Sequence, residues 1–383
     1  MEFIHTADWR IGHSFSGVEP ALRRQLDDGI RQALELLFIY ATKKGIPLIV
    51  CAGNAFANGQ LADVEHLRRL GGLCAKHPDI QLIIAPGAED PLATGNIYSR
   101  IQQSQIPANL QVVEKNKLLP FPDKNCSIYA APATSTHIEA DPLQWLREEA
   151  PAASSINIGL CHYPHYQAGD ASALQLDYLA CGGTAHYREI DPRCLYPGPP
   201  AQLDFGEPGF PLHVKISGPG ATPRIKKIAG IAPFQWIEEI LHFTDDTFAQ
   251  KVSRINAGTN RQIRKIGMDG HLSIRNYIEY RDLLENGRPG LHSIDDRVRI
   301  QPTHEDIEAL RDVNARALAQ SLMELREIEP SAGLEPGTVL KNKEGTFFLD
   351  RKAVADMADA IPNDEIYDQA LVSLYRQFGP DGE

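Results

Sequence analysis

The chain has 383 residues, of which 43% are hydrophobic and 23% are charged, and its formal net charge is −12. This composition is typical of a folded protein with two or three domains. No apolar run approaches the roughly 20 residues that a membrane helix needs, and we expect no signal peptide. The negative net charge excludes a basic field over the whole molecule, so any contact with DNA must come from local patches.

No two of the six cysteines have the C-x-x-C spacing of zinc sites, and several lie in apolar, strand-like runs. We therefore predict buried free thiols in a reducing, cytoplasmic compartment, and no structural zinc. The cysteines are Cys51, Cys74, Cys126, Cys161, Cys181 and Cys194.

Short apolar runs alternate with helical patterns over residues 1–185. Apolar residues recur at helical spacing over Ala21–Lys44, with Pro20 suited to the first turn of this helix and Gly45 to its end. A second helix is predicted at Asp63–Lys76. The predicted strands are Phe3–Thr6, Pro47–Ala52, Ile80–Ala85, Cys126–Ala131, Ile156–Cys161 and Tyr178–Cys181. This alternation predicts a layered α/β fold.

The next part of the chain has shorter patterns. Residues 211–240 are predicted to form β structure that closes the first domain, and residues 243–300 a small α/β domain. Thr303 and Asp306 have the spacing of a capping box, from which a long helix is predicted to run to about Glu329.

The C-terminal part begins with a linker rich in proline and glycine, residues 330–337. Two helices are predicted after it, at Arg351–Ala360 and Asp364–Phe378. Asn363 lies between them and can cap the second helix.

Four short motifs follow predicted strands, and a fifth motif comes after them. They are His5–Gly12, Ala52–Phe56, Pro86–Pro91, Asp177–Ala185 and Tyr196–Pro200. Strand ends are where α/β proteins gather the residues of their sites, so this placement predicts one shared site.

In this order the motifs resemble those of the calcineurin-like metallophosphoesterases and, more narrowly, the SbcD family, the nuclease subunits of double-strand-break repair complexes. His5–Trp9 is similar to the opening signature of that family, and Tyr196–Gly198 with Phe205–Glu207 to a later one. Pro233–Ile237 is similar to the segment that closes its first domain.

The resemblance implies a metallophosphoesterase-like β-sandwich flanked by helices, a small α/β capping domain and C-terminal helices. On this reading, residues 1–240 form the phosphoesterase-like domain, residues 243–330 the capping domain, and residues 338–383 a helical segment that binds an ATPase. The resemblance is most specific over residues 1–240.

Members of the family hold two metal ions, typically manganese, which clamp a phosphodiester and lower the pKa of a bound water. The corresponding positions here are Asp8, Arg10, Asn54, Ala88, Glu89, His162, Gly183 and Ala185. Only Asp8 and His162 keep the residue type that the resemblance implies for a ligand. A guanidinium has no lone pair for a metal, and alanine and glycine have no side-chain donor atom. We therefore expect no two-metal centre, no catalytic residue and no cofactor.

Arg10 stands where the family has a histidine ligand. We expect its fixed charge to replace the ions by pairing with Asp8 and with Glu89, because an unpaired buried carboxylate is costly. The alternative is that Arg10 points into solvent and that the pocket is merely eroded.

A remodelled site for one manganese or zinc ion is a second possibility. Its ligands would come from Asp8, Glu89, His162 and His186, with His165 close by in the sequence. The alternative is a hydrogen-bonded core His162 and exposed loop histidines. No serine, cysteine or phosphate-loop motif points to another reaction class.

Basic residues cluster in the predicted capping domain. The candidates for DNA contact are Arg254, Arg261, Arg264 and Lys265. The alternative is a solvated basic face, because phosphate binding needs several cations that converge in space.

The resemblance implies that the C-terminal helices grip the coiled coil of an SbcC-like ATPase. The candidate contact residues are Ile366, Leu371, Leu374 and Phe378, which suit helix-in-groove binding. The alternative is that these helices pack on their own domain. The resemblance also implies a homodimer formed through helices of the first domain, and Asp63–Lys76 is the first helix to examine.

The favoured hypothesis is a catalytically degenerate SbcD-like subunit that acts as a scaffold or DNA-end-binding partner of an SMC-type ATPase in DNA repair or DNA defence. The rival hypothesis is an active metal-dependent phosphodiesterase or nuclease with a single-metal site. A third is a remnant without any partner.

Overall fold

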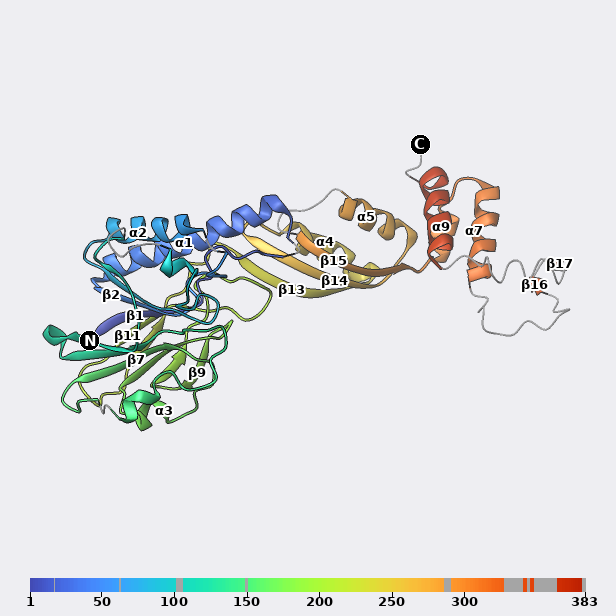
Figure 1. Ribbon diagram of the computed structural model, residues 1–383. Helices are drawn as coiled ribbons and strands as arrows, with labels where there is room; N and C mark the ends of the chain where they lie inside the picture. Colours follow the sequence, from blue (N-terminus) through green and yellow to red (C-terminus); the bar gives the residue numbers. More distant parts are fainter. Residues whose placement is uncertain are drawn as a thin grey trace. The chain divides into compact units, whose positions relative to one another are not determined.

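The structure is a computed structural model (Figure 1) that describes residues 1–16, 18–61, 63–100, 106–148, 151–285, 291–326, 340–342, 345–347 and 364–380. The chain divides into two compact units, a first unit of Met1–Ile237 and a second unit of Glu238–Glu383. The predicted linker 330–337 and the predicted helix Arg351–Ala360 lie outside the described residues. No helix in the described ranges is long and apolar enough to cross a membrane.

The first unit contains two six-stranded sheets. The first sheet is formed by β1 (Glu2–Thr6), β2 (Leu48–Ala52), β3 (Gln81–Ala85), β4 (Leu110–Val112), β11 (Leu212–Lys215) and β12 (Arg224–Lys227). The second is formed by β5 (Lys117–Phe121), β6 (Cys126–Ala131), β7 (Ile156–His162), β8 (Tyr178–Gly182), β9 (Arg188–Asp191) and β10 (Cys194–Tyr196). The strand orders are β12-β11-β1-β2-β3-β4 and β5-β6-β7-β8-β10-β9. Mixed sheets flanked by helices confirm the predicted α/β fold.

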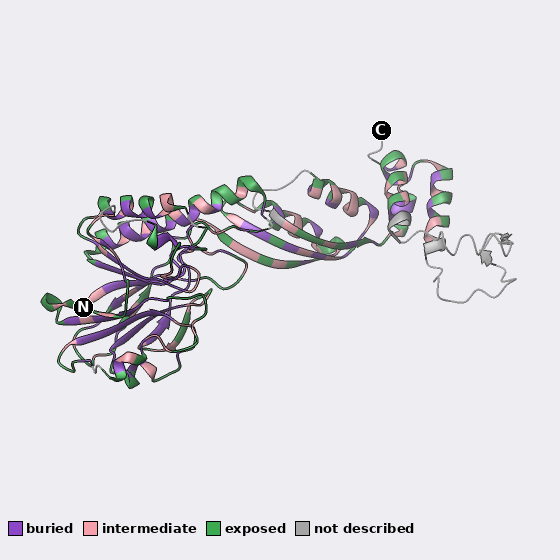
Figure 2. Cartoon of the chain, in the orientation of Figure 1, coloured by how far each residue is buried: buried purple, intermediate pink, exposed green. Residues whose placement is uncertain are grey.

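The two sheets pack face to face across one apolar core. Phe3, Val50 and Ile83 of the first sheet meet Ile158 and Tyr178 of the second in this core. Strands β1 to β4 are parallel, as are β6, β7 and β8. The central strands β2, β7 and β8 are buried along their length, because both of their faces are covered (Figure 2). This explains why their sequences are continuous apolar runs and do not alternate with polar residues.

Helices α1 (Pro20–Lys44) and α2 (Val64–Lys76) cover the outer face of the first sheet (Figure 1). The side chain of Glu19 caps the start of α1, and Gly45 ends it in the left-handed conformation, with φ 66°. Asp63 caps α2. Both helices confirm the predictions to within one residue. The outer face of the second sheet carries a second apolar cluster, to which α3 (Asp170–Ala173) and the 3-10 helix η4 (Gln144–Arg147) contribute. Two further 3-10 helices, η1 (Ile97–Ser99) and η3 (Pro122–Lys124), follow β3 and β5.

One buried histidine joins the two sheets. The backbone oxygen of Cys181 lies 3.1 Å from Nε2 of His5 and can only accept, so Nε2 carries the proton. Nδ1 of His5 then accepts from the hydroxyl of Tyr178 at 2.9 Å. Burial lowers the pKa of His5 to about 3, so this histidine is neutral. These two hydrogen bonds of His5 connect β1 of the first sheet to β8 of the second.

All six cysteines are free and buried, as predicted. Burial raises the pKa of the Cys51 and Cys181 thiols well above the usual range. These thiols are therefore protonated and inert packing groups.

The second unit begins with a three-stranded sheet. Its elements are β13 (Gln235–Phe243), η5 (Asp245–Thr247), α4 (Phe248–Asn256), β14 (Gln262–Leu272), α5 (Ile274–Glu285) and β15 (Leu291–Ile300). The strand order is β13-β14-β15, with β14 and β15 parallel. Phe243, Met268 and Val298 pack with Phe248 of α4 and Tyr280 of α5 in one core. This sheet and its two helices form the small α/β domain expected for residues 243–300.

The rest of the described second unit is helical. It comprises α6 (His304–Glu308), α7 (Val313–Arg326) and α9 (Asp364–Phe378), with a small hairpin of β16 (Leu340–Asn342) and β17 (Gly345–Phe347). The capping box of Thr303 and Asp306 is confirmed, and α9 has the predicted bounds. The single long helix predicted after Thr303 was wrong. Asp312 accepts from two backbone N–H groups and starts α7 as a separate helix.

The apolar face of α9 packs inside its own unit. Leu371 is 1% exposed and shares a core with Ala319 of α7 and Ile274 of α5, against which Leu374 and Phe378 also pack. The predicted third segment, 338–383, therefore belongs to the same compact unit as residues 243–330 in its described part. The side chain of Ile366 lies outside the described residues.

Arg264, one of the predicted DNA-contact residues, is a buried structural residue. Its side chain is 4% exposed, and its guanidinium lies 2.8 Å from Oε1 of Glu239. It also donates to the backbone oxygens of Ile255 at 2.7 Å and Arg254 at 3.2 Å. Arg264 thus ties α4 to β13 and β14 and does not face solvent.

We predict that Arg264→Ala lowers the free energy of unfolding by about 3–5 kcal/mol, because it leaves Oε1 of Glu239 and the backbone oxygens of Arg254 and Ile255 without their donor. Arg261→Ala, at an exposed position of the same segment, should change it by less than about 0.5 kcal/mol. Urea denaturation followed by circular dichroism measures both. Equal effects of the two variants would contradict the structural role.

Candidate functional site

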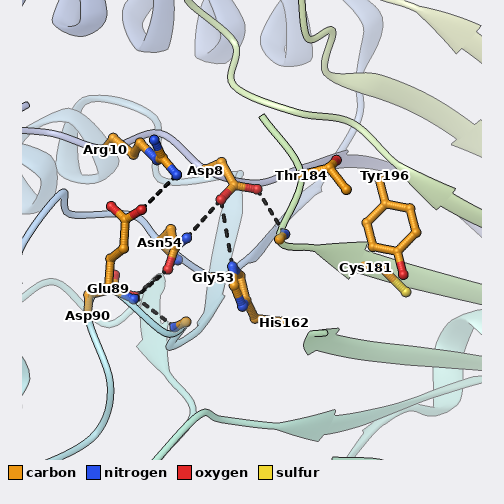
Figure 3. A network of polar contacts seen from close by, with 12 residues as sticks. Asp8, Arg10, Gly53, Asn54, Glu89, Asp90, His162, Cys181, Thr184 and Tyr196 are labelled. Carbon is orange, nitrogen blue, oxygen red and sulfur yellow. Dashed lines mark hydrogen bonds and ion pairs between the residues drawn. The ribbon is translucent and has the colours of Figure 1, made fainter. Parts of the chain in front are cut away.

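The carboxyl ends of five parallel strands bring the predicted motifs together at one edge of the sandwich (Figure 3). Each strand is followed at once by a loop that carries polar groups. The groups are Asp8 and Arg10 after β1, Asn54 after β2, Glu89 and Asp90 after β3, His162 at the end of β7, and Gly183 after β8. The structure therefore collects most of the candidate positions of the sequence in one place.

Both carboxylate oxygens of Asp8 are engaged by groups of the protein. Asp8 is 1% exposed. Its Oδ1 accepts from Nδ2 of Asn54 at 2.9 Å, and its Oδ2 accepts from the backbone N–H of Gly183 at 3.0 Å. Nε2 of His162 lies 3.6 Å from Oδ1, beyond hydrogen-bond distance.

The amide of Asn54 is oriented by partners on both sides. Its Oδ1 accepts from the backbone N–H of Glu89 at 2.8 Å, while its Nδ2 faces the Asp8 carboxylate. The reverse orientation would set a carbonyl oxygen against a carboxylate and an NH2 group against an N–H, so the network fixes the amide. The oxygen of Asn54 is therefore directed away from Asp8.

Arg10 forms an ion pair with Glu89, as the sequence hypothesis predicts in part. Nη2 of Arg10 lies 2.6 Å from Oε1 of Glu89, with side chains 28% and 33% exposed. The pairing with Asp8, which the hypothesis places first, was wrong, because the two oxygens of Asp8 take Asn54 and Gly183 as donors instead. Burial raises the pKa of Glu89, the Arg10 charge lowers it, and the Asp8 and Asp90 charges raise it further.

Asp90 anchors the loops that follow β2 and β3. Its carboxylate accepts from the backbone N–H groups of Asn54, Phe56 and Gly87 and from the hydroxyl of Tyr98, at 2.7–3.1 Å. Burial raises the pKa of Asp90 to about 6, and these donors limit the rise. The sequence motif contains Asp90, but its anchoring role depends on backbone donors that no motif reveals.

The loops adopt conformations that most residues avoid. The φ angles of Asp8, Arg10 and Asn54 are 52°, 50° and 51°, in the left-handed region. Aspartate and asparagine tolerate this region, whereas arginine gains nothing from it, so its contacts must hold it there. Gly183 has φ 112°, a conformation open almost only to glycine, and a histidine at this position would be strained.

His162 is a buried histidine whose ring nitrogens lack hydrogen bonds. The side chain is 5% exposed, and neither Nδ1 nor Nε2 has a hydrogen-bond partner in the structure. The ring fits against glycine backbone, since a Cβ atom added at Gly53 would lie 2.5 Å from it. The hydrogen-bonded core histidine expected as one alternative is therefore not what the structure contains.

The donor set does not fit a two-metal centre. Among the described residues, no three His, Cys, Asp or Glu side chains converge to form a group that could hold a metal ion. His186, a predicted ligand of the single-ion alternative, lies in an exposed loop together with Ala185, and Ala88 supplies no donor atom. A cavity beside Asp8 and Arg10 has a volume of about 10 Å³, which is the space of a single water.

The remaining candidates for DNA contact belong to the second unit. Arg254 pairs with Glu239 at 2.6 Å, and Lys265 pairs with Glu238 at 2.7 Å. Arg261 is exposed. The basic side chains of this segment are thus largely matched by acidic neighbours, so they do not form a converging set of free cations.

No family model matches the chain, and no curated protein matches it either. The likeness to the SbcD family therefore depends on the motifs quoted above. The structure itself shows a two-sheet α/β fold that gathers the motifs at one edge.

We predict that Asp90→Asn lowers the free energy of unfolding by about 2–4 kcal/mol at pH 8, where Asp90 is ionised. The asparagine NH2 group would face donors in place of an acceptor and leave at least one buried N–H unsatisfied. Asp79→Asn, which neutralises an exposed aspartate between α2 and β3, is the matched control. Chemical denaturation of both variants tests the prediction, and a loss below about 1 kcal/mol for Asp90→Asn would contradict the anchoring role.

Proposed function

We propose that this chain is a catalytically degenerate SbcD-like subunit, a scaffold or DNA-end-binding partner of an SMC-type, SbcC-like ATPase in DNA repair or DNA defence. The observation that carries the proposal is the engagement of both Asp8 oxygens by Asn54 and Gly183. Each oxygen of this carboxylate then has a lone pair committed to the protein. On this proposal the chain keeps the fold of a phosphoesterase, but it acts by assembling a complex and not by hydrolysis.

The chemistry of the site supports a role without hydrolysis. Metal-assisted cleavage of a phosphodiester needs ions that clamp the phosphate and activate water. In the first unit the fixed positive charge next to Asp8 and Asn54 is the guanidinium of Arg10, and it is neutralised by Glu89. Such an ion pair offers neither an open coordination position nor a free cation to a phosphate.

A partner helix would find its contact on α7. The side chains of Leu371, Leu374 and Phe378 pack within the second unit, so they are not free to bind a partner. Val313 and Leu318 of α7 are instead 72% and 50% exposed. We assign the contact with the coiled coil of the ATPase to the exposed side of α7 that carries Leu318, in the helix-in-groove manner.

Two further properties belong to the same proposal. Six buried free thiols support a reducing compartment, and we place the protein in the cytoplasm. We also propose a homodimer through the helices of the first unit, with α2 as the first element to examine.

The rival proposal, a single-metal phosphodiesterase or nuclease, is favoured by one observation. His162 is buried, its ring nitrogens have no hydrogen-bond partner, and Nε2 is directed at Asp8. A buried imidazole of this kind is a ready ligand for manganese or zinc. Metal content and activity separate the two proposals.

We predict that the chain purified in the presence of Mn²⁺ and then dialysed contains less than one tenth of an equivalent of metal. It should not cleave single- or double-stranded DNA or a chromogenic phosphodiester in added Mn²⁺, because the cleft lacks ligands. Elemental analysis and a gel-based cleavage assay, with an active phosphoesterase as positive control, provide the measurements. Stoichiometric metal, with cleavage that is abolished by His162→Ala, would establish the rival proposal.

We predict that affinity purification from the native host recovers a large coiled-coil ATPase. Leu318→Glu should reduce its recovery at least tenfold, because it replaces an exposed apolar side chain of α7 by a charge. Gln320→Glu, at an exposed position of the same helix, is the matched control. If no such ATPase is recovered with the unaltered chain, the scaffold role is wrong. Full recovery with Leu318→Glu would contradict only the assignment of the surface.

A further inference from the structure

Three carboxylates meet at the ends of β1 and β3. Asp8 and Asp90 are 1% and 0% exposed, and the side chain of Glu89 is 33% exposed. The charges of Asp8 and Asp90 raise the pKa of Glu89, so the three groups interact. Buried like charges that interact in this way are unfavourable unless cations or hydrogen-bond donors compensate for them. The compensation must therefore come from the surrounding side chains and backbone.

The compensating groups come from different strand ends and so connect them. The Asn54 amide joins the end of β2 to the end of β1 through Asp8, and to the loop after β3 through the backbone of Glu89. The N–H of Gly183 joins β8, in the second sheet, to Asp8. The ion pair of Arg10 and Glu89 connects the loop after β1 to the loop after β3 (Figure 3).

We propose that Asn54 and the Arg10–Glu89 pair take the structural place of divalent cations, by neutralising and connecting the strand ends so that the unit assembles without metal. This inference rests on the proposed function, since it concerns the same site in its state without hydrolytic ions. Asn54 is the residue that excludes a cation from this place.

The geometry around Asp8 supports the assignment to Asn54. Two ligands of one cation, each about 2.1 Å from it, lie about 3.0–3.5 Å apart in octahedral or tetrahedral geometry. Oδ1 of Asp8 lies 2.9 Å from Nδ2 of Asn54 and 3.6 Å from Nε2 of His162. These two distances lie within about 0.1 Å of that range, so small shifts of the side chains would let the three positions surround one small cation. The Asn54 NH2 group is a donor at the position where such a cation needs an acceptor.

The Arg10–Glu89 pair has a second structural task. Arg10 has φ 50°, and its backbone N–H donates to the oxygen of Asn54 at 3.0 Å. The ion pair therefore holds a residue in an unfavourable conformation next to the Asn54 connection. Loss of the positive charge alone would leave Glu89 facing Asp8 and Asp90 without compensation.

The first test compares Asn54→Asp with Asn116→Asp, which makes the same change of charge in an exposed turn. In EDTA, Asn54→Asp should lower the melting temperature by roughly 5–10 °C, because it sets a carboxylate against Asp8. Adding 1 mM Mn²⁺ should restore most of this loss and give about one bound ion in elemental analysis. The unaltered chain and Asn116→Asp should melt at the same temperature in EDTA and in Mn²⁺.

The second test is a cycle of Arg10→Gln, Glu89→Gln and the double variant in EDTA. Arg10→Gln should lower the melting temperature more than the double variant does, because only the single variant leaves Glu89 uncompensated. If Arg10→Gln is no less stable than the double variant, the pair does not have the proposed role.

The outcomes separate this inference from the proposed function. Stoichiometric Mn²⁺ on the unaltered chain, with a raised melting temperature, would contradict both. An unaltered chain that ignores Mn²⁺, together with an Asn54→Asp variant as stable as Asn116→Asp in EDTA, would contradict the inference and leave the proposed function intact.

Discussion

The hydrogen bond from the Asn54 amide to the Asp8 carboxylate is the interaction on which the described site depends. It joins the first two parallel strands, β1 and β2, at their carboxyl ends. Asp90, which accepts from the backbone N–H of Asn54, and the backbone N–H of Glu89, which donates to the Asn54 side chain, fix its geometry. Because residue 54 is an asparagine, Asp8 accepts a hydrogen bond from within the protein. The loops that carry Arg10 and Gly183 then close around a satisfied carboxylate.

The sequence predicts the scaffold well because local signals and buried runs coincide. Helix α1 has a proline at its start and Gly45 at its end, and the strands of the sandwich are short continuous apolar runs. The break before α7 was missed because apolar spacing continues across it, while the Asp312 cap that starts α7 is a local polar contact. The burial of Arg264 could not be predicted either, since its partner Glu239 is 25 residues away.

The sequence predicts which residues form the site, but it predicts only some of the contacts between them. Strand ends predict that Asp8, Asn54 and Glu89 meet, and charge predicts that Arg10 pairs with a carboxylate. The sequence does not reveal which carboxylate Arg10 pairs with, because the backbone N–H of Gly183, which follows β8 of the second sheet, donates to Asp8. Backbone donors cannot be recognised from residue identity, so the motif Pro86–Pro91 contains Asp90 but does not indicate its anchoring role.

The conformation of Gly183 limits which side chains this corner of the site can carry. A single substitution exchanges a side chain, but it does not move the peptide out of a region of φ that is open almost only to glycine. An imidazole at this position would therefore require the loop after β8 to change its backbone path as well as its side chain.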